Sequence, residues 1–535
     1  MRRPRSLVLA AFVLFAADVA RADELPPYTP PPPAQPTAPE PPLGGFHNGT
    51  FFLRDHADNF RLYVQGRVHA DLLGWIGPGV PSLGPDSALK TTFQLRRARA
   101  EIGGEFLQGE WQWQLSGDFG PTSVDNPAAK NAAPSCTVDP VAGTDTCSGT
   151  ASAAVEAPRV SAFATDAFIN YAPSPWLNVQ VGQYLLPFGM EARISDNTTP
   201  FLERGIVARL IAAPFTRDIG AMVWGEAPDR FVYYTLGLYN GDGPNRPNAD
   251  SRFDFVGHVI VRPLETSTFH GVLAPLRHAQ IGFSARYGSR DPREVGYDLP
   301  SLTTQGGYAF WKATYKDSLN RTLHIIPSSE HYSLGLDAYV PIDGFDLRGE
   351  FAYTNQNTRE AIDGYQLSPF TERLGTMKGW AYGVQAAYWI FGSRDIIGYP
   401  SYGKPLHVDL KTEQKPPSRG LQALAKVEQL HLSYAGATRA GVLDPKTPNG
   451  DIDVLAFAFG LNYWATRHLR VGLNYSIYTF PDSAPVTASA AGGPVQSPNQ
   501  RAVAPAQALV KGVDDGARDG GHNVHEVHAR VGVQF

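Results

Sequence analysis

The chain has 535 residues, of which 18% are charged and 11% aromatic, and its formal net charge is −5 at pH 7. This balance contains no basic excess, so nucleic acid is not an expected partner. After residue 22 no apolar run approaches the roughly 18 residues that a membrane-spanning helix needs, which excludes a helical membrane protein.

The first 22 residues predict export. Residues 2–5 carry three arginines, residues 7–17 form an apolar run, and Ala20 to Ala22 fit a small-x-small cleavage site. We therefore expect residues 1–22 to be a secretory signal peptide that is removed from the mature chain. Its removal leaves 42 of the 46 basic and 50 of the 51 acidic residues.

A proline-rich stretch follows. Residues 25–43 contain ten prolines in nineteen positions, a composition that cannot bury a core and is typical of a stiff, solvated spacer. We expect residues 23–50 to form a disordered periplasmic leader, or else a periplasmic tether. Residues 51–535 show no composition shift that would mark a domain boundary, and they are expected to form one β-barrel domain.

Alternation of apolar and polar side chains dominates the chain from residue 60 to its end. In residues 60–74, Val64 and Val68 lie on one face and Arg67 on the other, and residues 524–535 repeat the pattern. A period of two is typical of a β-strand with one apolar face. Sixteen such strands are predicted, near residues 60–74, 92–106, 110–119, 161–171, 176–184, 217–226, 231–239, 253–262, 278–288, 331–340, 345–354, 379–392, 421–435, 452–465, 469–480 and 522–535.

Short and long connections alternate between these strands. The short ones are at 107–109, 172–175, 227–230, 341–344 and 465–468, and the long ones at 120–160, 185–216, 289–330, 355–378 and 481–521. This alternation indicates an up-and-down antiparallel meander, and an even strand count places both chain ends at the short-turn end. Residues 307–316 also alternate. Either they form a hairpin within a long loop, or the predicted number of strands is wrong by two.

The only two cysteines, Cys136 and Cys147, lie in the long connection 120–160. In an exported chain they predict one local disulfide, the alternative being two unpaired thiols. A metal site needs more ligands than this region offers.

The polar faces decide which side of the sheet is inside. Closure into a barrel removes the exposed edges of a sixteen-stranded sheet. A packed interior could not absorb so many arginines, glutamines and carboxylates, whereas a water-filled lumen could. We therefore predict an all-β, transmembrane, antiparallel up-and-down β-barrel of about 16 strands with its apolar face in lipid. A soluble sandwich would need less polar inner faces, and a propeller would need a repeat that the chain lacks.

Several stretches resemble the phosphate-selective porin O and P family of Gram-negative outer membranes. They are FQLRRARAEIGGEF (93–106) and the stretches 166–205, 216–225, 234–243 and 380–392. The resemblance implies a sixteen-stranded, usually trimeric channel in outer-membrane lipid that passes small hydrophilic solutes, in some members preferentially anions. Phe535 is similar to the closing residue by which assembly machinery recognises outer-membrane strands.

The resemblance also implies that the loop 185–216 folds into the barrel and narrows it. A departure lies next to this loop. Relatives often carry a lysine just before the Pro-Phe-Gly triplet, where this chain has Leu185 and Leu186. A phosphate preference, a modest general anion bias and no bias therefore all stay open.

Arginines that line a pore favour anions. Arg97 and Arg99 share a polar strand face with Glu101 and Glu105, so they either act in the pore or form a solvated, ion-paired face. The predicted pore-lining or anion-contact residues are Arg67, Arg97, Arg99, Arg193, Arg204, Arg209 and Arg217.

No enzyme, cofactor or metal site is expected. The chain lacks G-x-S-x-G, H-E-x-x-H and P-loop patterns. His522, His525 and His528 alternate in face and cannot converge, and Asn449 with two aspartates offers too few calcium ligands. The expected function is a porin; the alternatives are a non-channel adhesion or scaffold barrel with a plugged lumen, and a secreted soluble β protein.

Overall fold

The computed structural model describes residues 42–76, 89–120, 135–139, 144–148, 163–211, 216–291, 296–300, 302–306, 309–311, 314–316, 322–362, 373–412, 418–438, 449–479 and 523–535. The predicted signal peptide, residues 1–22, lies outside the described residues. No helix in the described part of the chain is long and apolar enough to cross a membrane.

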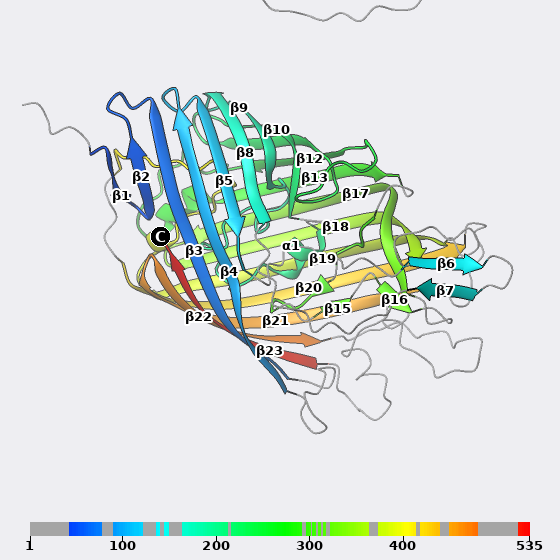
Figure 1. The fold of residues 1–535 in the computed structure, drawn as a ribbon. Helices are drawn as coiled ribbons and strands as arrows, with labels where there is room; N and C mark the ends of the chain where they lie inside the picture. Colours follow the sequence, from blue (N-terminus) through cyan, green and yellow to red (C-terminus); the bar gives the residue numbers. More distant parts are fainter. Residues whose placement is uncertain are drawn as a thin grey trace, which may run out of the picture. The chain divides into compact units, whose positions relative to one another are not determined.

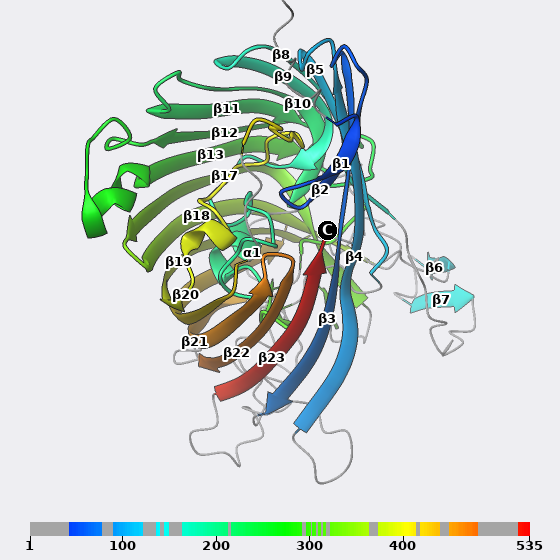
Figure 2. The ribbon, with the colours of Figure 1, turned by 90° about the vertical axis from the view of Figure 1, so that its left-hand side faces the viewer.

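Sixteen strands form a closed antiparallel barrel (Figures 1 and 2). Each pairs with the next along the chain, and β23 pairs with β3 to close the ring. The prediction of an up-and-down barrel is confirmed. The strands are β3 (Phe60–Ile76), β4 (Leu89–Phe106), β5 (Trp111–Asp118), β8 (Phe163–Ser174), β9 (Leu177–Leu185), β10 (Arg217–Glu226), β11 (Val232–Tyr239), β12 (Asp254–Val261), β13 (Gln280–Arg290), β17 (Thr322–Ile342), β18 (Phe345–Ile362), β19 (Arg373–Phe391), β20 (Gly420–Thr438), β21 (Asn449–Thr466), β22 (Leu469–Thr479) and β23 (Asn523–Gln534).

Several strands extend further toward the long-loop end than predicted. β17 begins at Thr322 rather than near residue 331, and β18 continues to Ile362 rather than to residue 354. Their backbone pairing continues from Ile342 opposite Phe345 to Leu323 opposite Ile362. Where a strand extends beyond the lipid, its outward-facing side chains need not be apolar. The apolar–polar alternation therefore ends before the backbone hydrogen bonds between the strands do.

Residues 307–316 add no strands to the ring. β15 (Ala309–Trp311) pairs with β14 (Leu302–Thr303), and β16 (Thr314–Lys316) pairs with the start of β17. The strand count therefore needs no change by two. Residues 309–311 and 314–316 pair with different neighbours rather than with each other, so the stretch is not the single hairpin that the other alternative described.

Side chains divide as the alternation predicted. On β3 and β23 the apolar residues Val68, Leu72 and Val531 are exposed on the outer surface, whereas Asp71 and Arg530 are buried on the inner side. The extreme case is Phe93 on β4, which is 82% exposed. An outer surface of this kind suits contact with lipid tails.

A hairpin precedes the barrel. β1 (Gly44–His47) pairs with β2 (Thr50–Arg54), and β2 pairs with the beginning of β3. β1 lies inside the range expected to be a disordered leader. The two-residue turn Asn48-Gly49, in which both residues have a positive φ, closes the hairpin and places β2 along the edge of β3. The hairpin continues the line of β23: β2 pairs with residues 61–64 of β3 and β23 with residues 67–76.

Two more strands lie in the connection between β5 and β8. β6 (Ser135–Asp139) and β7 (Thr144–Ser148) form a hairpin in which Cys136 stands directly opposite Cys147. Residues directly opposite in an antiparallel pair have Cα atoms at a spacing that a disulfide can bridge. The register agrees with the predicted disulfide, which stays a prediction because the two side chains are outside the described part.

Two segments fill the interior. The inward loop, Leu186–Ile211, connects β9 to β10 and carries α1 (Ile206–Ile211), which lies inside the ring of strands (Figure 2). The mouth segment, Gly392–Thr412, begins the connection between β19 and β20 at the short-turn end and carries the 3₁₀ helix η3 (Arg394–Ile396). A second long connection at this end contains η1 (Gly271–His278). The expectation that every connection there would be short was therefore wrong.

Candidate functional site

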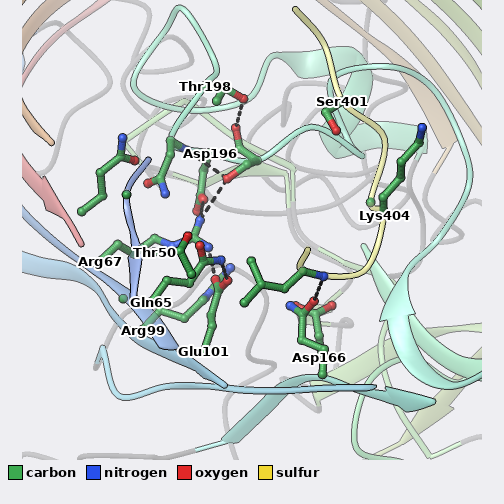
Figure 3. Close-up of a pocket in the computed structure, with 18 of the residues that line it drawn as sticks. Thr50, Gln65, Arg67, Arg99, Glu101, Asp166, Asp196, Thr198, Ser401 and Lys404 are labelled. Carbon is green, nitrogen blue, oxygen red and sulfur yellow. Dashed lines mark hydrogen bonds and ion pairs between the residues drawn. The ribbon is translucent and has the colours of Figure 1, made fainter. Parts of the chain in front are cut away.

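A cavity of about 360 Å³ lies inside the barrel near its short-turn end. It is bounded by the wall strands β3, β4 and β8 to β10, by the inward loop and by the mouth segment. Figure 3 shows Arg67, Arg99 and Glu101 on the wall, with Ser401 and Lys404 of the mouth segment facing them across the cavity. Elements from both ends of the barrel therefore meet around one space.

Cationic side chains outnumber carboxylates in this cavity. Seven arginines and lysines line it against three carboxylate side chains. The cations are Arg67, Arg99, Arg193, Arg204, Arg217, Lys404 and Arg467, and the carboxylates are Glu101, Asp166 and Asp196. The structure thus brings five of the seven predicted arginines together here and places Arg97 and Arg209 outside the cavity lining.

Two carboxylates of the inward loop fasten it to the arginine-rich wall. Asp196 accepts a hydrogen bond from Arg67 and pairs with Arg97, and Glu203 accepts two hydrogen bonds from Arg97 at 2.7 and 3.0 Å. Burial acts to raise the pKa of Asp196, but Arg67 and Arg97 outweigh it and hold that pKa well below its usual range. The pKa of Glu203 is lowered in the same way, with Arg97 as the leading cation. Both carboxylates therefore stay ionised and paired.

A β-bulge adds an arginine that the alternation pattern did not predict. The register between β3 and β4 passes from His69 opposite Arg97 to Ala70 opposite Leu95, so Arg96 is the extra residue. Arg96 and Arg97 consequently both point inward and are both buried. Arg96 Nε lies 3.3 Å from Glu203. Two consecutive arginines in a strand were the available signal, since one of them would otherwise face lipid.

Other predicted arginines pair with carboxylates of the wall itself. Arg99 Nη2 lies 3.0 Å from Asp118, and the Arg217 guanidinium donates to both oxygens of Asp166 at 3.1 Å. Arg67 also pairs with Glu101. Arg99 is therefore ion-paired, as one of its two alternatives predicted, but it is buried and its partner is Asp118 rather than Glu101 or Glu105. Asp118 does not line the cavity, so this pair offsets part of the cationic excess of the lining.

Two further predicted arginines, Arg204 and Arg209, belong to the inward loop and bind backbone carbonyls. Arg204 donates to the carbonyls of Glu191 and Ile194 at 3.0 and 3.2 Å. Arg209 donates to Thr303 Oγ1 and to the carbonyl of Gln305, each at 3.0 Å, and so ties α1 to the connection after β13. Arg209 therefore serves the architecture of the loop rather than the cavity.

Carboxylates on the opposite wall hold the backbone of the inward loop. Glu350 accepts from the N–H groups of Met190 and Glu191 at 2.7 and 2.8 Å, and Glu428 accepts from Ile206 N–H at 2.7 Å. The inward loop thus pairs its carboxylates with the arginines of β3 and β4 and donates its backbone N–H groups to the carboxylates of β18 and β20. Its position inside the barrel is fixed from both sides, as expected for a loop that narrows the lumen.

Ring contacts and ion pairs hold the mouth segment to the wall. Tyr402 is 1% exposed, and its ring lies 5.8 Å from those of Tyr233 and His258. Lys404 Nζ lies 2.6 Å from Glu226, and His407 Nδ1 lies 2.9 Å from Glu105. The hydrogen bond to Glu105 raises the pKa of His407 above its ordinary 6.5. Sequence reasoning missed this segment because it has no periodic pattern.

The comparisons with known proteins point to one family. Residues 83–264 match the family model of phosphate-selective porin O and P. Four of the five stretches that carried the resemblance lie within the matched residues. The resemblance is confirmed, and with it the location in the outer membrane of a Gram-negative cell. No curated protein matches the chain.

Solved structures also match at low identity. OmpT of Vibrio cholerae, in a trimer form, aligns with a TM-score of 0.44 and 9% identity over 89% of this chain and 100% of that chain. The outer-membrane channel DcaP of Acinetobacter baumannii aligns with a TM-score of 0.45 and 10% identity over 90% of this chain and 99% of that chain.

Proposed function

We propose that this outer-membrane porin, whose residues 83–264 match the phosphate-selective porin O and P family, passes small hydrophilic solutes by passive diffusion and favours anions. The observation that carries the anion preference is the cavity lining, with seven cationic and three carboxylate side chains. Permanently charged guanidinium groups in a narrow passage attract anions and repel cations. Arg67, Arg99, Arg193, Arg204 and Arg217 are the proposed anion contacts, with Lys404 added to the set.

The proposed bias is modest and general rather than specific for phosphate. Arg67, Arg99 and Arg217 each share their charge with a carboxylate, which weakens the field that a passing anion meets. Leu185 lines the cavity at the place where the family often supplies a lysine. A neutral side chain there offers no donor to a phosphate oxygen.

We further propose that the barrel assembles as a homotrimer in outer-membrane lipid. The apolar outer surface supports contact with lipid, and the trimer follows from the family resemblance. Cross-linking of the purified protein in mild detergent tests the trimer, which a single monomeric species would rule out.

A plugged, non-channel barrel is the second candidate, and one observation favours it. The inward loop and the mouth segment occupy much of the interior, and three smaller cavities between the inward loop and the wall measure only about 10 to 20 Å³. An adhesion or scaffold protein would have no need of a wider passage.

One measurement separates the candidates. The purified protein is inserted into a planar bilayer, and the zero-current potential is measured under a tenfold potassium chloride gradient. A potential toward the chloride value supports the anion-preferring porin. A potential near zero or toward the potassium value keeps the porin and rejects the anion preference, and the absence of discrete conductance supports the plugged barrel.

A further inference from the structure

The surroundings of one cavity arginine differ from those of the ion-paired Arg67, Arg99 and Arg217. Arg193 of the inward loop lines the cavity and is only 1% exposed, yet among the described residues no carboxylate lies within 4.0 Å of its guanidinium. Within the same part of the chain its Nε has no hydrogen-bond partner, and its Nη1 lies 3.5 Å from Tyr233 Oη. A buried cation with an unused hydrogen-bond donor lowers the stability of the folded protein unless an anion pairs with it.

Apolar and aromatic side chains also line the cavity. Phe168 and Tyr184 line the cavity and pack edge to face with ring centroids 5.9 Å apart. Leu185 lies beside them, opposite Arg217 in the register between β9 and β10. The Arg193 guanidinium itself lies 5.9 Å from the ring centre of Tyr233. The lining of this cavity therefore combines a buried guanidinium that has an unused donor with aromatic rings and a leucine side chain.

The size of the space points the same way. A cavity of about 360 Å³ falls at the lower end of the roughly 300–1,000 Å³ that small-molecule sites occupy. A single inorganic phosphate would leave most of that space and all of the apolar wall unused. A molecule with an anionic head and a compact ring would use both.

We propose that this cavity is a binding site for organic anions that carry a compact apolar or aromatic body, with the carboxylate at Arg193 and the body against Phe168, Tyr184 and Leu185. The inference rests on the proposed function, since it names the solute class that the cavity selects on the path. The arginines paired with Glu101, Asp166 and Asp196 then attract anions in general, and the part around Arg193 discriminates among them.

Discrimination against phosphate follows from hydration and charge. Phosphate carries more than one negative charge and three strong acceptor oxygens, which must all find donors when it leaves water. Leu185, Phe168 and Tyr184 supply no cation to it. A benzoate ion has only one carboxylate to dehydrate, and hydrogen bonds from Arg193 replace the lost water. Its ring gains apolar contact with Phe168 and Tyr184.

Isothermal titration of the full-length protein in detergent tests the site with three probes: benzoate, acetate and inorganic phosphate. Acetate has the same head group as benzoate without the ring. We expect benzoate to bind about tenfold or more tightly than either of the others, which is the effect of burying one ring face. Equal binding of acetate and benzoate, or tighter binding of phosphate, overturns the inference.

Two variants and a matched control sharpen the test. Arg193→Gln is expected to weaken benzoate binding about tenfold, the usual effect of losing a charge-assisted hydrogen bond. Leu185→Lys adds the family's lysine and is expected to shift the preference toward phosphate without disturbing the inward loop. Arg252→Gln, a partly exposed arginine outside the cavity, is expected to leave all three affinities unchanged. If Arg193→Gln does not fold, Leu185→Lys alone decides, and an unchanged preference rejects the site.

Bilayer recordings distinguish this inference from the proposed function. Benzoate that binds and reduces the chloride current supports both. Benzoate that binds to a protein without conductance rejects the channel and keeps the site. A conducting protein that neither binds nor is blocked by benzoate rejects the site and keeps the channel.

Discussion

At the scale of single residues, the lumen is organised by shared charges rather than by isolated arginines. Asp196 serves Arg67 and Arg97 together, and Glu203 serves Arg96, Arg97 and Arg530. A carboxylate shared in this way holds the inward loop and at the same time cancels part of the positive field. The ion pairs that anchor the inward loop therefore weaken the attraction of the same arginines for anions.

Removal of one loop carboxylate should separate these two effects. Asp196→Asn is expected to lower the free energy of unfolding by roughly 3 kcal/mol, because it removes one of the two carboxylates that pair with each of the buried Arg67 and Arg97. It is also expected to move the zero-current potential further toward the chloride value. Denaturant titration and bilayer recording measure the two effects. Asp229→Asn, in a short turn, is the control, and an Asp196 variant with unchanged selectivity would contradict the shared-charge account.

Alternation in the sequence correctly predicted that Arg67, Arg97 and Arg99 face inward. It could not predict Arg96, because a bulge shifts the face of a side chain without any change in composition. It could not predict their partners either, since Asp196 and Glu203 come from a loop about 100 residues further along the chain. The face on which a strand residue lies follows from its neighbours in the sequence, whereas an ion pair across the lumen joins residues that are far apart in the sequence.

At the scale of elements, the mouth segment is the feature without a sequence signature. Its contacts lie on well-separated strands of the wall: Lys404 binds Glu226 at the end of β10, and His407 binds Glu105 near the end of β4. Leu406 and Val408, on either side of His407 in the sequence, pack with Phe52 and Tyr63. The mouth segment therefore extends across the short-turn end of the barrel rather than contacting a single strand. Because both its anchors come from distant strands, no run of residues within 392–412 could reveal it.

Tyr402 is the deepest side chain of this crossing. Tyr402→Ala is expected to enlarge the single-channel conductance and to lower the free energy of unfolding by about 3 kcal/mol, as large-to-small changes at buried sites do. Tyr388→Ala, on the outer surface, is the matched control for the loss of a tyrosine. Unchanged conductance in the Tyr402 variant would show that the crossing does not limit the current.

The contact between His407 and Glu105 gives this element a pH dependence. A histidine whose pKa is raised in the folded state stabilises that state fully below its ordinary pKa, and the stabilisation is lost as pH rises through the raised value. The mouth segment should therefore be held more firmly at about pH 5.5 than at about pH 8.5.

We expect the conductance to be lower at the acidic value, by less than about twofold because the His407 side chain is half exposed. His407→Gln should abolish the difference, and His270→Gln, exposed near η1, should preserve it. A difference that persists in His407→Gln would assign the pH dependence to another group.

At the scale of the whole molecule, sequence and structure agree most closely. All sixteen predicted strands are present, because a strand between lipid and water must alternate along its entire buried length. The closing pair, β23 with β3, involves residues 67–76 and 525–534. Next to it, Gly66 and Phe535 exchange two backbone hydrogen bonds, at 2.6 and 2.9 Å.

Gly66 leaves no room for a side chain at this closure. A Cβ there would lie 2.8 Å from Phe535 Cζ and 3.1 Å from the carbonyl of Arg99. Gly66→Val should therefore reduce the fraction of protein that migrates as a folded barrel in unheated SDS electrophoresis. Gly349→Val, where a Cβ would meet nothing within 4 Å, should not. Equal migration of the two variants would mean that the closure tolerates the displacement of Phe535.

The hairpin before the barrel bears on the order in which the molecule can be assembled. The strands that close the ring are separated by more than 450 residues, so the edge of β3 must wait for the whole chain. An edge left waiting invites pairing with the wrong strand. β2 is only a few residues from β3 and can cover residues 61–64 at once. It thereby shortens the vulnerable edge and marks where β23 has to stop, so that the register of the last strand is set before that strand arrives.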